Sequence, residues 1–335
     1  MGNTFSIQSE YCKQLLENFP KAPILTLAKK AYKDSPMLFR NVENARSYLR
    51  TLTGTNGNSR RKSLTDKTCI REIENNYNPF VIPDPEKEDY DQFILPPECN
   101  NILHIQDVHI PYHSIESLTL AIKYGKEQKI NTLLLGYDFL DFYQMSRFEK
   151  DPRKKNTKYE LTIANQLLDV FQKEFPNARF FWRNGNHDER LQRYLVVKAP
   201  ELLDIQEYHL KNLLHLEERG ITYIESKRIV KAGKLNIIHG DEFIGGSSGG
   251  VNPARGLFLK TGENTLCGHF HKTSEHTERT IGDSVVGCWS MGCCTQLHPE
   301  YARLNKWNNG FAHIIVYKDG NFQLNNKKVI KGQTV

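Results

Sequence analysis

The sequence of 335 residues contains no run of 18 or more apolar residues, and residues 1–10 lack the basic start and apolar stretch of a secretory signal. Without such segments we expect neither a transmembrane helix nor export, and therefore no association with a membrane. Cysteine is scarce, with seven residues and no Cys-x-x-Cys pair. An odd number of cysteines without an export signal predicts reduced thiols in a cytoplasmic protein, where they act as small buried hydrophobic residues.

Positive charge is distributed unevenly along the chain, whose formal net charge is +6. Residues 1–71 contain 13 lysines and arginines against 5 acidic residues, a balance of +8, whereas the other 264 residues contain 32 against 34, a balance of −2. Because the basic excess belongs to the N-terminal part alone, it indicates a polyanionic partner for that part.

Residues 1–71 are predicted to form a small all-helical, basic domain. Apolar residues recur at helical spacing in three segments, at 11–19, 24–34 and 41–52, and Asn41 is expected to be the N-cap of the third. Residues 53–67 are rich in Gly, Asn, Ser and Arg, which predicts a loop. Residues 72–99 contain five prolines and are predicted to be a linker or strap that leads into the next domain.

From residue 100 to residue 335 the pattern changes to alternating strands and helices, which predicts a layered α/β domain. Apolar strands are expected at residues 102–105, 132–135, 179–182 and 235–238, with helices at 114–127 and 159–174. Near the C-terminus, Asp319-Gly320 lies between two β-rich segments and predicts a hairpin.

Five polar motifs lie where strands are expected to end. They are Asp107-Val108-His109, Asp138-Phe139-Leu140-Asp141, Gly185-Asn186-His187-Asp188, His239-Gly240-Asp241 and Gly268-His269-Phe270-His271. In open α/β sheets ligands bind beyond the carboxyl ends of the strands, so we expect these side chains to converge. Carboxylates, imidazoles and amide oxygens bind divalent metals, and a two-metal site needs one carboxylate that bridges the metals. The motifs supply such a donor set.

Together and in this order, the motifs resemble those of the calcineurin-like metallophosphoesterase superfamily over about residues 100–322. The resemblance implies a layered β-sandwich flanked by helices. It also implies two divalent metal ions, with Mn²⁺ expected and Fe, Zn, Ni or Mg as alternatives, because such ligands accept several metals. The implied metal ligands are Asp107, His109, Asp138, Asn186, His239, His269 and His271.

The resemblance further implies a role for each residue. The first metal would be held by Asp107, His109 and His271, the second by Asn186, His239 and His269, and Asp138 would bridge them. His187 would not be a ligand but a catalytic residue, which stabilises the transition state or protonates the leaving oxygen, and Asp188 would orient it. The two metals would lower the pKa of a water, and the resulting hydroxide would attack phosphorus.

One motif departs from the family pattern, which has Gly directly before the bridging aspartate. Here the order is Gly136-Tyr137-Asp138. We assign the bridge to Asp138 because the Asp-x-x-Asp spacing to Asp141 fits. Tyr137 is expected to narrow the site or to shift the end of the strand, and Asp141 to hydrogen-bond rather than to bind metal.

Residues 142–148 and 185–190 resemble segments of phosphoesterases from tailed phages and prophages, which implies a bacterial or phage-infected host cytosol. Arg147 and Arg190 are candidates for binding substrate phosphate, with a structural ion pair as the alternative.

The three N-terminal helices, of which the third is basic, resemble a helix-turn-helix module. Its candidate contacts with DNA phosphates are Arg46, Arg50, Arg60, Arg61 and Lys62. The alternative is a helical cap that packs on the catalytic domain.

The sequence therefore predicts a metal-dependent phosphoesterase and favours a phosphodiesterase or nuclease that acts on nucleic acid. One alternative is hydrolysis of a small phosphate ester, such as a cyclic nucleotide, or of a phosphoprotein. Another is a non-catalytic DNA-binding or phage structural module with a vestigial metal site, against which the intact ligand set argues.

Overall fold

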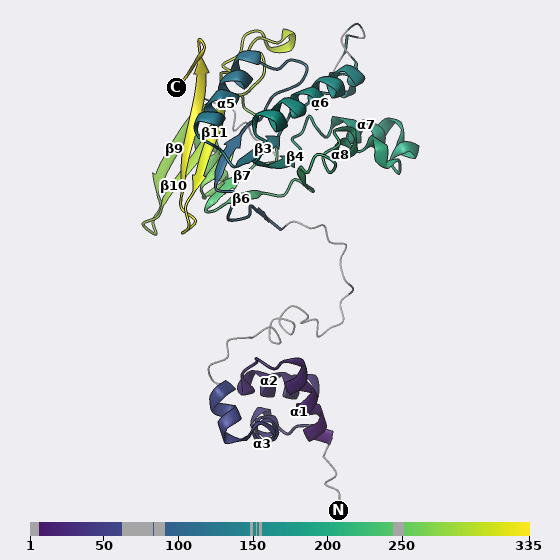
Figure 1. The fold of residues 1–335 in the computed structure, drawn as a ribbon, viewed down its shortest axis with the longest axis vertical. Helices are drawn as coiled ribbons and strands as arrows, with labels where there is room; N and C mark the ends of the chain where they lie inside the picture. The colour runs from purple at the N-terminus through teal and green to yellow at the C-terminus, as the bar shows by residue number, and fades with distance from the viewer. Residues whose placement is uncertain are drawn as a thin grey trace, which may run out of the picture. The chain divides into compact units, whose positions relative to one another are not determined.

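The computed structural model describes residues 7–61, 83, 91–147, 150–151, 153, 156–243 and 251–335, without the side chains of residues 55–61 and 301. The chain divides into two compact units, Met1–Lys87 and Glu88–Val335 (Figure 1). None of the described helices is both long and apolar enough to cross a membrane.

The N-terminal unit contains the three predicted helices, α1 (Ile7–Asn18), α2 (Ile24–Asp34) and α3 (Val42–Arg61). Their apolar stripes meet in a core that includes Cys12, Leu27, Ala28, Ala31 and Leu49. At the start of α3, the side chain of Asn41 accepts a hydrogen bond from the backbone N–H of Asn44 at 2.8 Å. Asn41 therefore caps the helix, as predicted.

The predicted loop at residues 53–67 is wrong at its start. Helix α3 is interrupted at Gly54, which has φ 65° and ψ 177°, but helical backbone resumes and continues to Arg61. Glycine tolerates this conformation because it has no Cβ, so the break stays local. The Asn and Ser residues beyond it are weak helix formers but do not exclude a helix. Residues 62–67 lie outside the described part of the chain.

The larger unit is built on two β-sheets. Among the described residues, the first sheet has seven strands in the order β13 (Gln333–Thr334), β12 (Phe322–Ile330), β11 (Asn309–Val316), β2 (Asn101–His104), β3 (Thr132–Gly136), β4 (Arg179–Arg183) and β5 (Thr222–Ile224). The described part of the second has six, in the order β1 (Phe93–Ile94), β6 (Val230–Ala232), β7 (Leu235–Ile237), β8 (Thr265–Cys267), β10 (Val285–Ser290) and β9 (Ser274–Arg279). Strands β2 to β5 are parallel to one another, so their carboxyl ends share one edge.

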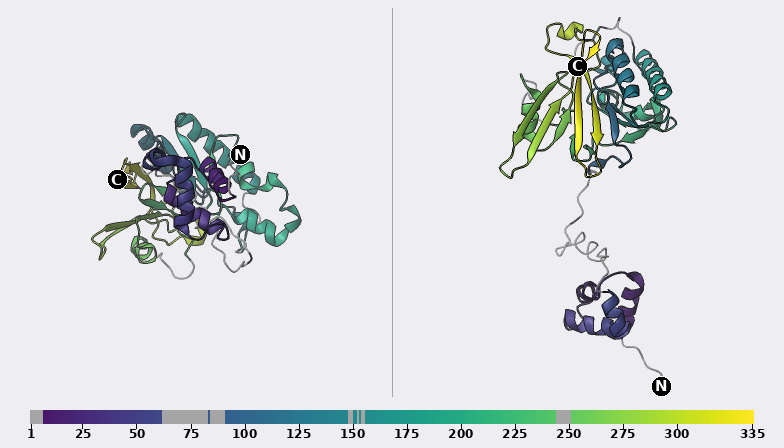
Figure 2. Two further views of the ribbon diagram at one scale, coloured as in Figure 1. Left: turned by 90° about the horizontal axis from the view of Figure 1, so that it is seen from below. Right: turned by 60° about the vertical axis from the view of Figure 1, so that its left-hand side comes forward.

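Helices flank the two sheets, as Figures 1 and 2 show. Leu103, Leu133 and Leu135 of the first sheet share a core with buried residues of α5 (Ile115–Glu127) and α6 (Thr157–Glu174). Alternate residues of the same strands, such as Ile102 and Leu134, share another core with the second sheet. These strands are continuously apolar because both of their faces are buried. Helix α9 (Pro253–Thr261) packs against the second sheet. The predicted layered α/β sandwich flanked by helices is confirmed.

Two local predictions can be compared with the structure at the edges of the sheets. Strands β11 and β12 form the predicted hairpin around Asp319-Gly320, with Val316 opposite Phe322 and Gly320 at φ 79°. Residues 93–94, which were predicted to belong to the strap at 72–99, form β1 and pair in parallel with β6. The end of the predicted strap thus supplies an edge strand of the second sheet.

The described cysteines are all buried, and none of them is in a disulfide. This agrees with their interpretation as small hydrophobic residues; Cys69 lies outside the described residues.

Candidate metal centre

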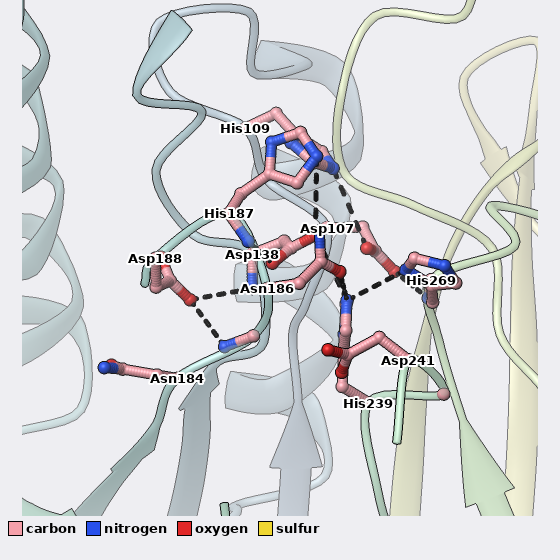
Figure 3. A network of polar contacts seen from close by, with 12 residues as sticks. Asp107, His109, Asp138, Asn184, Asn186, His187, Asp188, His239, Asp241 and His269 are labelled. Carbon is pink, nitrogen blue, oxygen red and sulfur yellow. Dashed lines mark hydrogen bonds and ion pairs between the residues drawn. The ribbon is translucent and has the colours of Figure 1, made fainter. Parts of the chain in front are cut away.

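The five polar motifs converge at the carboxyl ends of strands β2, β3, β4, β7 and β8 (Figure 3). The turns after β2 and β3 are hydrogen-bonded to each other, since the backbone N–H of Asp107 donates to the carbonyl of Tyr137 at 2.9 Å. The N–H groups of Val108 and His109 both donate to the carbonyl of Asp138, at 3.0 and 3.1 Å. The two aspartates that were predicted to bind metal are thereby placed side by side.

A first cluster contains the side chains of Asp107, His109 and His271, whose donor atoms lie within 4.8 Å of one another. The Nε2 atoms of the two histidines face each other at 3.1 Å, and Oδ1 of Asp107 lies 3.2 Å from Nε2 of His271. Two imidazole lone pairs would repel at this distance unless a proton or a metal ion lies between them. Oδ1 of Asp107 is buried and has no hydrogen-bond partner among the described residues, so it too is open to a cation.

A second cluster surrounds Nε2 of His239. That atom lies 3.1 Å from Oδ2 of Asp138, 3.1 Å from Oδ1 of Asn186 and 3.2 Å from Nδ1 of His269. A carboxylate, an amide oxygen and two imidazoles form a donor set that suits divalent transition metals. The structure therefore brings all seven predicted ligands into two adjoining groups.

Asp138 belongs to both neighbourhoods. Its carboxylate lies within 4.8 Å of donor atoms of His239 and His269. It also lies within 4.8 Å of donor atoms of His109 and His187. Its Oδ1 also accepts a hydrogen bond from the backbone N–H of His187 at 2.6 Å. A carboxylate that two sets of donors share has the position that a bridging ligand requires.

The backbone at the predicted metal ligands is unusual, because five of the seven have a positive φ. The angles are 50° at Asp107, 47° at His109, 68° at Asp138, 65° at His269 and 53° at His271. Such conformations cost about 1–3 kcal/mol each in residues with a Cβ, and they persist where the surrounding structure enforces them. The sharp turns direct side chains inward immediately after their strands end, so this strain accompanies the convergence of the donors.

Electrostatics indicates that the centre needs positive charge. Burial disfavours ionisation of Asp107 and Asp138, but the nearby histidines outweigh it and hold both pKa values below the usual range. Burial likewise disfavours the imidazolium forms, yet the carboxylates raise the pKa of His109 to about 10 and that of His239 to about 9. Burial lowers the pKa of His269 and His271, which favours neutral rings with a lone pair to donate. Protons on His109 and His239 therefore occupy the place that a bound cation would take.

The residues fit divalent metals, and this predicts that metal affinity rises with pH. A metal must displace the protons of His109 and His239, so we expect the apparent affinity for Mn²⁺ to rise from pH 6.5 towards pH 9. The rise should be up to roughly tenfold per pH unit for each displaced proton. Calorimetric titration in buffers of different ionisation enthalpy measures the released protons. An affinity independent of pH, with no proton release, would contradict the assignment.

His187 lies beside both clusters and is held from both of its ring nitrogens. The carboxylate of Asp141 can only accept a hydrogen bond, so Nδ1 of His187 donates to it, at 2.7 Å. The guanidinium of Arg190 can only donate, so its Nη2 donates to Nε2 of His187, at 2.9 Å. The ring is therefore a neutral Nδ1–H tautomer in this arrangement. Arg190 also donates through Nη1 to Asp141, at 2.8 Å to the carbonyl and 3.1 Å to Oδ1.

The prediction that Asp188 orients His187 is wrong, because Asp141 makes that contact. The carboxylate of Asp188 instead accepts backbone N–H bonds from Asp138 at 2.8 Å, Leu140 at 3.0 Å and Gly185 at 2.9 Å. Burial and the nearby Asp138 raise the pKa of Asp188 to about 7, although these backbone donors oppose the shift. Asp188 thus holds together the two turns that carry Asp138 and Asn186, and its effect on the site is structural.

Gly185 allows the turn after β4 to approach Asp138. A Cβ added at Gly185 would lie 2.3 Å from Oδ1 and 2.5 Å from the backbone nitrogen of Asp138. We expect Gly185→Ala to destabilise the protein by about 1–3 kcal/mol through overpacking and to weaken metal binding, as measured by urea unfolding and calorimetry. Gly282→Ala is the matched control, because nothing lies within 4 Å of its added Cβ. Equal behaviour of the two variants would show that the close approach is unimportant.

Sequence reasoning missed a buried ion pair beneath His239. Arg183, at the end of β4, is fully buried and pairs with Oε1 of Glu242 at 2.6 Å. Glu242 accepts the backbone N–H groups of His239 and Gly240, at 2.9 and 2.6 Å. Burial opposes its ionisation, but Arg183 outweighs burial and lowers the pKa of Glu242 to about 2. The pair fixes the turn that carries His239, and no local pattern pointed to it.

An aromatic contact at His271 was also missed. The rings of Trp307 and His271 are 4.3 Å apart between centroids and inclined at 67°, and the N–H of Asn308 donates to the carbonyl of His271 at 2.9 Å. This packing orients a ligand imidazole from a segment that carries no recognisable motif.

Tyr137 does not narrow the mouth of the site. Its side chain is fully buried in the core between the sheets, with its ring 4.9 Å from that of His104 and 5.0 Å from the guanidinium carbon of Arg183. Tyr137 has φ 52°, so the chain turns sharply here even without the glycine of the family pattern.

The predicted phosphate-binding arginines line one pocket next to the metal centre. Arg147 is exposed, whereas Arg190 is partly buried and engaged with Asp141 and His187 as described above. Arg190 thus makes the structural ion pair that was the alternative, while it still lies at the site.

The predicted DNA contacts lie in the N-terminal unit. Arg46 pairs with Glu43 at 2.9 Å, and Arg50 is exposed one helical turn later. The side chains of Arg60 and Arg61, and all of Lys62, lie outside the described residues. DNA binding by this unit stays a prediction.

No protein-family model matches the sequence, and no curated protein matches it. Among solved structures, the chain is similar to vacuolar protein sorting 29 from Cryptosporidium parvum, at 16% identity over 70% of this chain and 94% of that chain, with a TM-score of 0.37. A similarity at this level carries no weight for function, which rests on the geometry of the site.

Proposed function

We propose that the chain is a metal-dependent phosphoesterase of the calcineurin-like metallophosphoesterase superfamily, and that it acts as a phosphodiesterase or nuclease on nucleic acid. The main support is the placement of Asp138, whose carboxylate lies within 4.8 Å of donor atoms of His239 and His269 on one side and of His109 on the other. Two sets of ligands around one buried carboxylate form the arrangement that two-metal hydrolysis requires.

In this proposal Asp107, His109 and His271 would hold one metal and Asn186, His239 and His269 the other, and Asp138 would serve as the shared carboxylate. When bound, two divalent cations would polarise the phosphoryl group and lower the pKa of water, with Mn²⁺ as the first candidate and Fe, Zn, Ni or Mg as alternatives. The enclosing residues keep the ligands aligned, because the Arg183–Glu242 pair, Trp307 and the Asp188 carboxylate each fix one of the turns.

His187 is the residue that we assign to proton transfer or to stabilisation of charge on the phosphoryl oxygens. Asp141 accepts from Nδ1 and stabilises the imidazolium that forms when Nε2 takes a proton. A protonated Nε2 can no longer accept from Arg190, so Nη2 of that arginine becomes available to a phosphoryl oxygen. Arg190 can thus keep its ion pair with Asp141 through Nη1 while Nη2 donates to the substrate phosphate.

Nucleic acid is favoured as the substrate by the positive charge around the site. The pocket that includes Asn186 and His187 is also lined by Arg147, Lys150 and Lys198. Cations in this position attract a chain with several phosphates more strongly than a small ester with a single phosphate. The resemblance of residues 142–148 and 185–190 to phage-type phosphoesterases points in the same direction.

The test is hydrolysis of bis-p-nitrophenyl phosphate by purified protein supplied with Mn²⁺, Ni²⁺, Fe²⁺ or Zn²⁺ in turn. We expect metal-dependent release of nitrophenol, with the diester preferred over p-nitrophenyl phosphate. Comparison of single-stranded DNA, duplex DNA, RNA, cyclic nucleotides and a phosphopeptide then separates a nuclease from the alternative substrates. Absence of turnover with every metal would leave only the non-catalytic alternative.

A further inference from the structure

A pocket of about 650 Å³ adjoins the metal centre and shares Asn186 and His187 with it. Its other walls are the segment from Met145 to Lys150, as far as it is described, and one face of helix α7 (Arg190–Lys198). We call this pocket the α7 groove. Its volume falls within the range of about 300–1,000 Å³ that is usual for ligand sites. The groove is therefore large enough for much more than the phosphate at the metals.

Helix α7 presents two different faces. Leu191 and Leu195 are buried in the core, whereas Arg190, Tyr194 and Val197, spaced four and three residues apart, line the groove. The side chain of Tyr194 is 39% exposed and that of Val197 is 72% exposed. An aromatic ring beside a small apolar side chain on an open surface offers a platform for a flat ligand.

The charge of the groove has a single sign. The ionisable Lys and Arg residues in its lining are Arg147, Lys150, Arg190, Arg193 and Lys198, and its described lining contains no carboxylate. Carboxylates outside the groove partly neutralise Arg190 and Arg193, which pair with Asp141 and with Glu189, the latter at 2.7 Å. A neighbouring pocket of about 340 Å³ contains both signs, with Asp188, Glu189 and Glu225 among its lining residues. The charge of the described lining therefore favours an anion in the α7 groove more than in its neighbour.

We propose that the α7 groove binds the nucleotide next to the scissile phosphate of a single-stranded nucleic acid, with its base stacked on Tyr194 and the following phosphate near Lys198. This inference rests on the function proposed above and specifies its substrate. A strand supplies both parts that the groove accommodates, a flat ring and a second negative charge. A paired base in a duplex has no free face for stacking, so single strands are preferred. Small esters such as bis-p-nitrophenyl phosphate have no second phosphate to reach Lys198.

The first experiment measures kcat and KM of the full chain with Mn²⁺ for a short single-stranded oligonucleotide and for bis-p-nitrophenyl phosphate. Loss of one stacked base weakens binding by roughly 5- to 150-fold, so Tyr194→Ala should raise KM for the oligonucleotide by that factor. The effect on kcat should be much smaller, and Tyr194→Phe should restore the oligonucleotide KM. Val196→Ala, on an exposed part of the same helix outside the groove, should behave as wild type. A fall in kcat for both substrates without a rise in the oligonucleotide KM would show a merely structural role and overturn the proposal.

A second experiment does not depend on turnover and follows binding of the same labelled oligonucleotide by fluorescence anisotropy at several salt concentrations. Lys198→Ala should reduce the slope of log affinity against log salt by about 1, because one phosphate contact is lost. Lys173→Ala is the control, since Lys173 likewise lies in the last turn of its helix, α6. If Lys198→Ala leaves the salt slope unchanged and Tyr194→Ala leaves the affinity unchanged, nucleotide binding in the α7 groove is overturned, even if the enzyme hydrolyses esters. Intact groove binding without hydrolysis of any ester would instead refute the proposed function.

Discussion

Replacement of Asp138 by asparagine is expected to reduce turnover of bis-p-nitrophenyl phosphate by about a thousandfold or more. Among the described residues, Asp138 is the carboxylate that belongs to two of the candidate metal-binding groups, one with His239 and His269 and one with His109 and His187. An amide of nearly the same shape has one oxygen and no charge, so it cannot bind two cations together. The loss of several kcal/mol of charge stabilisation in the transition state corresponds to this factor.

The measurement combines steady-state rates with the metal content of the purified variant. Asp169→Asn is a suitable control, because the side chain of Asp169 is 65% exposed and pairs with Arg219. It should keep wild-type activity and two bound metals. Asp138→Asn should remain folded by circular dichroism but bind less metal. If Asp138→Asn retained most of the activity, Asp138 could not be the bridging ligand, and the two-metal assignment would lose its main support.

Replacement of His187 by alanine is expected to reduce turnover by about 10²–10⁴-fold without loss of metal. The size of the loss should depend on the leaving group. A nitrophenoxide is stable enough to leave without being protonated, whereas the alkoxide of a nucleotide must be protonated as it leaves. The loss of turnover should therefore be larger for an oligonucleotide than for bis-p-nitrophenyl phosphate. This difference tests whether Nε2 protonates the leaving oxygen. A loss equal for both substrates would indicate that His187 stabilises the phosphoryl oxygens instead.

The companion variant Asp141→Asn tests how His187 is positioned. Asp141 accepts from Nδ1 at 2.7 Å, and its charge favours the imidazolium form. Asparagine keeps the shape but removes that charge, so kcat should fall while the bound metal content stays at the wild-type value. Asp188→Asn should instead weaken metal binding, because Asp188 bonds to the backbone N–H groups of Asp138, Leu140 and Gly185 and not to the imidazole. A fall in kcat at unchanged metal content in Asp188→Asn alone would reverse the assignment that the structure makes.

The sequence by itself predicted the N-terminal helices, the central apolar strands and the positions of the expected metal ligands after those strands. The continuously apolar strands β2, β3 and β4 were recognisable because strands that are buried on both faces need no polar alternation. The motifs after them were recognisable because the carboxyl ends of parallel strands share an edge, whatever the loops between them do. For this reason the seven predicted ligands converge even though Tyr137 replaces a glycine in one motif. Helix ends were also visible where a local cap determines them, as Asn41 does for α3.

Only the tertiary structure decided which residues support those ligands. Asp141 and Asp188 both stand near a motif, and sequence spacing favoured Asp188 because it adjoins His187. The fold reversed this choice, because the left-handed turns at Asp138 and Phe142 bring Asp141 to the imidazole from 46 residues away. The ion pair of Arg183 with Glu242 spans 59 residues, and Trp307 reaches His271 from a segment without a motif. The α7 groove likewise depends on how one amphipathic helix is set against the metal centre. Local patterns reflect local backbone preferences and burial, whereas these contacts join distant segments whose meeting is decided by packing of the whole domain.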